Sequence, residues 1–314
     1  MDKYFFVARG IKNGQEEISE QEYISLKRAK DFLFKAMSIE EHFNSVIENY
    51  IELEKDFYGC SLRNVVFCEG LNMSLSDDEQ WCRSVEKIYF MNRRVINLLA
   101  VGFLYVEHLK HSIHSIYNRE NRNYNLVKSL TQSEYDGEDP GYRVMCAFRN
   151  HCQHYDIPFQ MLNQNFKRVE AKSGVFNKYV FSLKIRVDEL RKNKKFKKET
   201  LSELNEMGNE IDLLPLIRGY LRSLWKIHEQ TRKSLRADLN LCESKVSSRI
   251  DNYKGRMGFY SSTKVTRYDA LGSVVESEEI FDFFSRRRNE LEMKNNNFDF
   301  FRKSFISNES PRID

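Results

Sequence analysis

The sequence predicts a mainly α-helical fold, a helical bundle with a minor β-hairpin, and three observations support it. Only 4 prolines and 13 glycines occur in 314 residues, whereas β-sandwiches and barrels use these residues in their many turns. Hydrophobic residues make up 41% of the chain and aromatic residues 13%, which excludes a mainly disordered protein. Apolar residues also recur at steps of three and four over long stretches, which is the spacing of one helix face.

The region over residues 71–255 is expected to form the helical core. A capping box at Ser76–Glu79 opens its first long stretch, because Ser and a Glu three residues later satisfy each other's backbone N–H groups. Pro158 ends a later, shorter helix, because the residue before a proline avoids the helical conformation. The expected elements of this core are helices over 76–118, 126–130, 140–156 and 215–250 and a β-hairpin over 175–190.

Two regions are expected to flank this core. Residues 1–70 predict an N-terminal helical extension of two short helices, the second opened by a capping box at Ser38–Glu41. Residues 256–314 predict a C-terminal α/β extension, with a strand over 263–268 and a helix over 275–293. The chain is therefore expected to fall into three consecutive regions.

Charge, cysteine content and motifs limit the functional class. The chain has 50 Lys and Arg against 46 Asp and Glu, a balance that does not by itself indicate nucleic acid. Its six cysteines are dispersed without a CxxC pair, which favours reduced thiols in the cytoplasm over a disulfide framework or a zinc cluster. No apolar run of about 18 residues occurs, so no membrane association is expected. Walker, GxGxxG, HExxH and GxSxG motifs are missing, which leaves ATPase, dehydrogenase and protease functions without support.

The short helix over 140–156 is expected to have one apolar face and one polar face. At about 100° per residue, the side chains that share the direction of Phe148 are expected to face the core. They are Val144, Met145, Cys152 and Tyr155. The residues expected on the opposite, polar arc are Arg149, Asn150, Gln153 and His154. Arginine and histidine on one arc indicate a surface for binding phosphate and transferring protons.

The string FRNHCQHYDIP at residues 148–158 resembles the R-N-x3-H signature of the HEPN superfamily (higher eukaryotes and prokaryotes nucleotide-binding domain). The resemblance implies an all-α bundle with long antiparallel helices. It also implies a metal-independent endoribonuclease of the kind found in bacterial toxin–antitoxin and anti-phage defence systems. In such enzymes two copies of the motif meet across a homodimer and form one composite site. The resemblance covers about eleven residues, and the regions 1–70 and 256–314 have no counterpart in it.

The residues of the motif take separate roles in this hypothesis. RNA carries its own nucleophile, the 2′-hydroxyl, so cleavage requires a base, an acid and positive charge near the phosphate. His154 is expected to transfer protons, Arg149 to bind the phosphate through its two parallel N–H groups, and Asn150 to orient the RNA or the histidine. The residues expected to contact the substrate are Gln153, His151, Lys194 and Lys195. No metal and no cofactor are expected.

The partners that the resemblance implies are RNA, a second copy of the chain, and an antitoxin or defence-system protein that restrains the nuclease. A non-catalytic HEPN-like protein whose polar arc binds a nucleotide, RNA or another protein is the alternative function. Growth separates the two, because only the nuclease would be toxic as wild type and harmless as His154→Ala.

Two rival groups of residues are weaker candidates. Arg222 and His228 have a similar spacing, but His228 continues an apolar helix register, which favours a buried structural histidine. Glu107, His108, His111 and His114 lie on one face of the long helix over 76–118. Some of them could meet one metal ion, but no fourth ligand is apparent.

Overall fold

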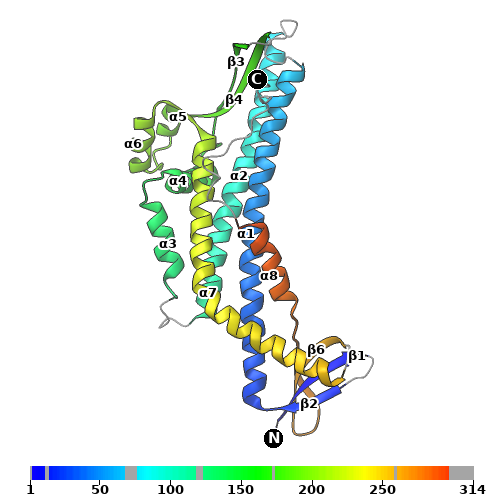
Figure 1. Ribbon diagram of the computed structural model, residues 1–314. Helices are drawn as coiled ribbons and strands as arrows, with labels where there is room; N and C mark the ends of the chain where they lie inside the picture. Colours follow the sequence, from blue (N-terminus) through cyan, green and yellow to red (C-terminus); the bar gives the residue numbers. More distant parts are fainter. Residues whose placement is uncertain are drawn as a thin grey trace. The chain divides into compact units, whose positions relative to one another are not determined.

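The computed structural model describes residues 2–10, 14–67, 76–117, 123–171, 174–257 and 260–296 (Figure 1). These ranges hold eight helices and seven strands, and helix accounts for most of their residues. The expectation of a mainly α-helical protein is therefore confirmed. None of the helices in these ranges has both the length and the apolar character that crossing a bilayer requires.

The chain divides into two compact units, each assembled from separate segments. Unit 1 takes its described residues from 1–44, 108–126 and 229–296, and unit 2 takes its own from 45–107 and 127–228. The units are thus interleaved along the sequence, unlike the consecutive regions 1–70, 71–255 and 256–314 that the sequence analysis drew. Three helices contribute long segments to both units: α1 (Glu20–Phe67), α2 (Asp77–Ile116) and α7 (Leu213–Met257). A fourth helix, α3 (Leu126–Tyr135), contributes only its first residue to unit 1.

Unit 1 combines parts of these helices with a four-stranded antiparallel sheet. Its strands are β1 (Lys3–Gly10), β2 (Gly14–Ile18), β6 (Tyr260–Tyr268) and β7 (Val274–Glu279), in the order β2-β1-β6-β7, and α8 (Phe283–Lys294) completes the unit. Phe6 of β1 pairs with Val265 of β6 in register, and both side chains are fully buried. The sheet therefore contributes to the core of this unit.

The structure corrects two expectations for the terminal regions. Residues 1–70 do not form two short helices, because their beginning is the β1–β2 hairpin and a single helix, α1, then runs through Ser38. An apolar stripe crosses Ser38 without a break, since Ala36, Ile39 and Phe43 are all buried, so the Ser–Glu pair lies inside a helix instead of opening one. The stretch 275–293 is likewise part strand (β7) and part helix (α8).

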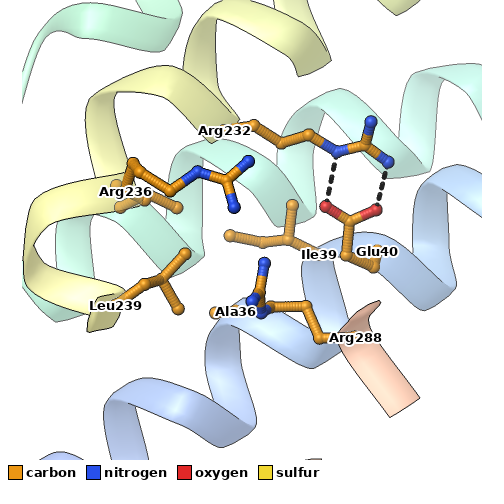
Figure 2. Close-up of a pocket in the computed structure, with 8 residues that line it drawn as sticks. Ala36, Ile39, Glu40, Arg232, Arg236, Leu239 and Arg288 are labelled. Atoms are coloured by element: carbon orange, nitrogen blue, oxygen red, sulfur yellow. Dashed lines mark hydrogen bonds and ion pairs between the residues drawn. The ribbon is translucent and has the colours of Figure 1, made fainter. Parts of the chain in front are cut away.

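A cavity of about 10 Å³ lies inside unit 1, among the arginines drawn in Figure 2. Each arginine has a carboxylate partner: Arg232 with Glu40, Arg236 with Glu292, and Arg288 with Glu243 and Glu292. A volume of this size holds about one water molecule. The cluster therefore stabilises the packing of α1, α7 and α8 and is too small to accept a nucleotide.

Unit 2 contains the motif helix and most of the predicted core. Besides parts of α1, α2 and α7, its elements are α3 (Leu126–Tyr135), α4 (Gly141–His154), β3 (Met161–Ala171), β4 (Gly174–Arg186), α5 (Val187–Arg191), α6 (Lys198–Met207) and β5 (Glu210–Asp212). The three strands form an antiparallel sheet in the order β3-β4-β5. Of the hairpin expected near 175–190 only the strand β4 lies in that range, because its partner β3 precedes it and residues 187–190 begin α5. The helices expected at 76–118, 126–130, 140–156 and 215–250 correspond to α2, α3, α4 and α7.

Local sequence signals explain how the long helices of unit 2 begin and pack. The predicted capping box of α2 forms, because the Glu79 N–H donates to Ser76 Oγ at 3.3 Å and the Ser76 N–H donates to Glu79 Oε2 at 3.0 Å. Gly102 lets α2 approach α7, since a Cβ at this position would collide with the ring of Tyr220. Close contact between α2 and α7 forms the floor on which α4 lies.

Candidate functional site

The motif helix α4 is held tightly at its beginning. A Cβ on Gly141 would come within 2.6 Å of the Tyr220 backbone nitrogen, so only glycine allows this approach of α4 to α7. The Gly141 N–H donates to the Asp139 carboxylate at 3.0 Å, just before the first turn of the helix, whose N-cap position is Pro140. Arg143 then pairs with Glu203 of α6 through Nε at 2.7 Å. These contacts position α4 against α7 and α6 (Figure 1).

The two faces of α4 match the helical wheel, with one correction. Val144, Met145 and Phe148 are buried, whereas the side chains of the arc are exposed at Asn150, Gln153 and His154 and half-buried at Arg149. Tyr155 was expected in the core but is 52% exposed. Its backbone leaves the helix at φ −140° and ψ −71°, so the wheel no longer gives its direction.

Arg149 lies over an aromatic ring that the sequence analysis did not include in the site. Its guanidinium carbon is 3.7 Å from the centre of the Phe103 ring of α2, a cation–π contact. Nη1 donates to Asn150 Oδ1 at 3.1 Å, and the buried Nε makes no hydrogen bond within the described chain. The contact with Phe103 limits the directions in which the guanidinium can turn, which suits it to a fixed anion.

His151 occupies a different environment from the surface contact expected for it. Its side chain is only 3% exposed, and the Asn193 amide donates to Nδ1 at 2.9 Å. Because Asn193 Oδ1 accepts the Lys195 N–H at 3.0 Å, the amide nitrogen is the atom that faces the ring, and Nδ1 carries no proton. Burial lowers the pKa of His151, against the opposing charge of Asp156. His151 is therefore a neutral structural histidine, and its assignment to RNA contact is corrected.

The lysine-rich turn over 192–198 is attached to α4 by two buried side chains. Asn193 contacts His151, and Phe196 packs edge-on against Phe148 with ring centres 5.8 Å apart. Lys194 and Lys195 are exposed between these two anchors. The structure therefore places both predicted lysines on a turn that is fixed to the last turns of the motif helix.

His154 is the accessible histidine of unit 2. Its side chain is exposed and makes no hydrogen bond to any residue that the structure describes, and the same holds for Gln153. Gln153 follows Arg149 by about one helical turn, and His154 lies one residue farther along the helix, so the three residues lie along one broad polar arc. The structure brings Arg149 and Asn150 into contact, but it leaves the imidazole of His154 free to meet a substrate.

Among the described residues, the other candidate groups, a second histidine, a metal position and a cysteine, do not form a catalytic site. His228 is fully buried with its Nδ1 2.8 Å from the Tyr105 hydroxyl, which confirms the interpretation of a structural histidine. No three His, Cys, Asp or Glu side chains of the described residues converge on a metal position, those near His108 included. Burial raises the pKa of Cys152 to about 12, so this thiol is not a nucleophile at neutral pH.

Two residues of the site were missed by sequence reasoning. Phe103 belongs to α2 and Asn193 to the lysine-rich turn, so neither is close to the motif in sequence. An exposed phenylalanine on a polar helix face was the only signal for Phe103, and nothing distinguished Asn193 from other polar turn residues.

Comparisons with known proteins add no family to this description. The scan against protein-family models matches no family, and neither the curated proteins nor the solved structures give a match. The resemblance of residues 148–158 to the HEPN signature and the geometry of α4 are thus the two grounds for a functional proposal.

Proposed function

We propose that the protein is a metal-independent endoribonuclease of the HEPN type, a cytoplasmic bacterial toxin or anti-phage defence effector. The observation that carries the proposal is the polar face of α4. It presents the exposed His154 five residues after Arg149, whose guanidinium is held over Phe103 at 3.7 Å. A proton-transfer group next to an oriented cation is the minimum that cleavage of RNA by its own 2′-hydroxyl requires.

The proposed chemistry is a transfer of the phosphate within the RNA strand. One imidazole removes the proton from the 2′-hydroxyl, and O2′ then attacks the adjacent phosphorus. The P–O5′ bond breaks as a second imidazole gives its proton to the leaving O5′. The products are a 2′,3′-cyclic phosphate and a 5′-hydroxyl end, so no water and no metal ion is consumed. Arg149 neutralises the charge that builds up on the phosphate in the transition state.

A second copy of the chain supplies the second imidazole in this proposal. The sequence has seven histidines, and the three in unit 2 are His151, His154 and His228. Two of these are buried and hydrogen-bonded, which leaves His154 as the accessible one. We therefore propose a homodimer in which two α4 helices face each other, with an HEPN-like bundle of long antiparallel helices around them and a regulatory partner protein that restrains cleavage.

Cleavage of a labelled RNA by the purified protein in excess EDTA tests the proposal. The wild type should cut and leave 2′,3′-cyclic phosphate ends. His154→Ala should be inactive, and Lys128→Ala, at an exposed position of α3 outside the polar face of α4, should retain most activity. Cleavage that EDTA abolishes, or that survives His154→Ala in full, would contradict the mechanism.

The alternative function is binding without catalysis by an HEPN-like protein. It is favoured by one observation, because no described side chain holds the His154 ring in a defined orientation, whereas acid–base groups are usually oriented by a hydrogen bond. Expression in bacteria separates the two functions. Toxicity of the wild type that His154→Ala removes supports the nuclease, and equal growth of both strains supports binding alone.

A further inference from the structure

The four-stranded sheet of unit 1 has one face that packs against helices. Phe6 of β1 is fully buried on this face, and its ring centre lies 5.6 Å from that of Tyr253 of α7. On the same face Glu276 of β7 accepts a hydrogen bond from the Tyr23 hydroxyl of α1 at 2.8 Å. Helices α1 and α7, whose ends in unit 1 lie beside the sheet in Figure 1, therefore cover this face. The residues that alternate with these along each strand point to the opposite face.

The opposite face of the sheet carries a cavity of about 390 Å³, which we name the sheet cavity. It is lined by Lys3 and Phe5 of β1, Gln15 of β2, Tyr268 of β6 and the turn residues 269–272. Lys3 lies opposite Tyr268 in the strand register, and Phe5 follows Lys3 by two positions, so their side chains share one face. The pairing of β2 with β1 places Gln15 on this face as well. Cavities that bind small molecules have volumes of about 300–1,000 Å³, so the sheet cavity is large enough for such a ligand.

Two aromatic rings form the apolar part of the sheet cavity. The ring centres of Phe5 and Tyr268 are 5.4 Å apart, and the ring planes are almost perpendicular at 86°. Both side chains are half-buried. In this edge-to-face arrangement each ring keeps at least one face that the other ring does not cover. A flat ring of a ligand can therefore stack on this pair.

Polar groups of three kinds surround the two rings. The exposed Lys3 ammonium makes no ion pair, and the exposed Gln15 amide no hydrogen bond, with any residue that the structure describes. Asp269 Oδ1 accepts the backbone N–H groups of Leu271 at 2.9 Å and Ser273 at 2.8 Å. These two hydrogen bonds fix the turn and hold the carboxylate at the edge of the cavity. The sheet cavity thus offers a cation, an amide and an oriented carboxylate around an aromatic pair.

We infer that the sheet cavity binds a nucleotide, with its base stacked on Phe5 and Tyr268 and its phosphate on Lys3. Every base has a flat face that stacks on aromatic side chains, and amides and carboxylates such as those of Gln15 and Asp269 pair with base edges. Lys3 lies about 7 Å from Phe5 along β1. A ligand that meets both therefore needs a spacer between its ring and its anionic group, which the sugar of a nucleotide provides. The cavity lies in the terminal regions, which have no counterpart in the HEPN resemblance, so the inference does not depend on the proposed nuclease.

Isothermal titration calorimetry of the full chain with AMP, GMP, CMP and UMP tests the inference. The nucleotide that binds most tightly is then compared with its nucleoside, which lacks the phosphate, and with indole-3-acetate, an aromatic anion without the sugar spacer. The cavity variants are Lys3→Gln and Phe5→Leu. The matched control is Lys264→Gln, on the same face of the sheet but outside the cavity, and Arg149→Gln detects binding at α4 instead. Circular dichroism and melting temperature check that every variant folds.

Lys3→Gln should weaken binding of the nucleotide by about fivefold or more and leave its nucleoside unaffected, because only the phosphate meets the ammonium. Phe5→Leu should weaken both by about fivefold or more, which is the lower end of what base–aromatic stacking contributes. Lys264→Gln and Arg149→Gln should change neither.

Three outcomes would overturn the inference. They are no binding of any of the four nucleotides at millimolar concentration, equally tight binding of indole-3-acetate, and binding that Arg149→Gln removes while Lys3→Gln and Phe5→Leu keep it. RNA cleavage is scored separately, and Lys3→Gln should cut RNA at the wild-type rate. A protein that binds the nucleotide as described but cuts no RNA would uphold the inference and contradict the proposed nuclease.

Discussion

The Asn193 side chain donates a hydrogen bond of 2.9 Å to Nδ1 of the buried His151. This contact joins the lysine-rich turn to the motif helix through the one motif residue that does not face solvent. It also determines the protonation state of the ring, because an Nδ1 that accepts a hydrogen bond carries no proton. His151 therefore supports the geometry of α4, and the proposed mechanism assigns proton transfer to His154.

Asn193→Ala should lower the free energy of unfolding by about 1–3 kcal/mol, because it leaves a buried ring nitrogen without its partner. Urea unfolding measures the effect. Asn97→Ala, at an exposed position of α2, is the matched control and should change stability by less than about 0.5 kcal/mol. Equal unfolding midpoints for the two variants would show that the hydrogen bond does not hold the turn.

The stability of the protein should fall on acidification through His151. Burial lowers the pKa of this group in the folded protein below its ordinary value of 6.5, so the unfolded chain binds the proton more readily. Stability is then fully present above pH 6.5 and is lost progressively as the pH falls towards the pKa of the folded state. Melting temperatures between pH 8 and pH 5 should therefore drop more steeply for the wild type than for His151→Gln. His154→Ala should keep the wild-type dependence of melting temperature on pH. If the melting temperature of His151→Gln falls as steeply with acid as that of the wild type, His151 is not the group responsible.

Arg149 and His154 should act on one transition state. The factors by which their substitutions slow cleavage should therefore not multiply in the double variant. His154→Ala should reduce the cleavage rate by roughly 10² to 10⁴. Arg149→Lys keeps the charge but loses the planar fork and the contact with Phe103, and it should also be severely impaired. The double variant should be about as slow as the slower single variant. Single-turnover rates decide the question, and a double variant slowed by the product of both factors would mean that the residues act independently.

His228→Ala should lower stability and spare chemistry. The substitution opens a cavity between α2 and α7 and removes the partner of the buried Tyr105 hydroxyl, which together cost about 2–4 kcal/mol. Melting temperature and cleavage should be measured side by side, below the unfolding transition. A stable but inactive His228→Ala would mean that Arg222 and His228, and not Arg149 and His154, are the catalytic pair.

Two glycines of unit 2 should respond to alanine in opposite directions. Gly59 lies in α1 with no atom within 4 Å of an added Cβ, so Gly59→Ala should stabilise the protein by about 0.5–1 kcal/mol through helix propensity. Gly141→Ala should destabilise it by more than about 1 kcal/mol, because the new Cβ meets the backbone of α7. Denaturant unfolding of both variants checks the pair. A stabilised Gly141→Ala would show that α4 does not approach α7 so closely.

Capping boxes, apolar stripes and alternating residues predicted the elements whose conformation depends on residues close together in the sequence. Helix α2 was predictable because its capping box and its apolar stripe agree, and strand β4 because its β-branched and aromatic residues alternate, whereas its partner β3 was not predicted. Helix α1 was misread at Ser38, where a box-like sequence occurs inside an apolar stripe that continues on both sides. The β1–β2 hairpin was missed although its pairing is local, with Ala8 opposite Gly14. The pairing of β1 with β6 joins residues 250 or more positions apart in the chain, and periodicity carries no information on such pairing.

In the candidate site, too, features set by the helix itself were predictable, and features set by residues distant in the sequence were not. The wheel of α4 predicted which face is polar, because helix geometry alone decides it. It could not predict that Arg149 lies over Phe103, nor that His151 accepts a hydrogen bond from Asn193, since these partners come from other elements. The direction of Tyr155 was also beyond the wheel, because the chain leaves the helix at that residue.

The interleaved composition of the two units has a consequence for biosynthesis. The chain leaves the ribosome from its N-terminus, yet unit 2 is complete only when the segment of α7 up to His228 has emerged. The motif at 149–154 therefore exists for 65 residues of synthesis without Gly219, on which α4 packs. At ordinary translation rates this interval lasts about 3–13 s. The proposed nuclease thus has no assembled site until this part of α7 has been made, and the proposed restraining partner has that time to reach the nascent chain.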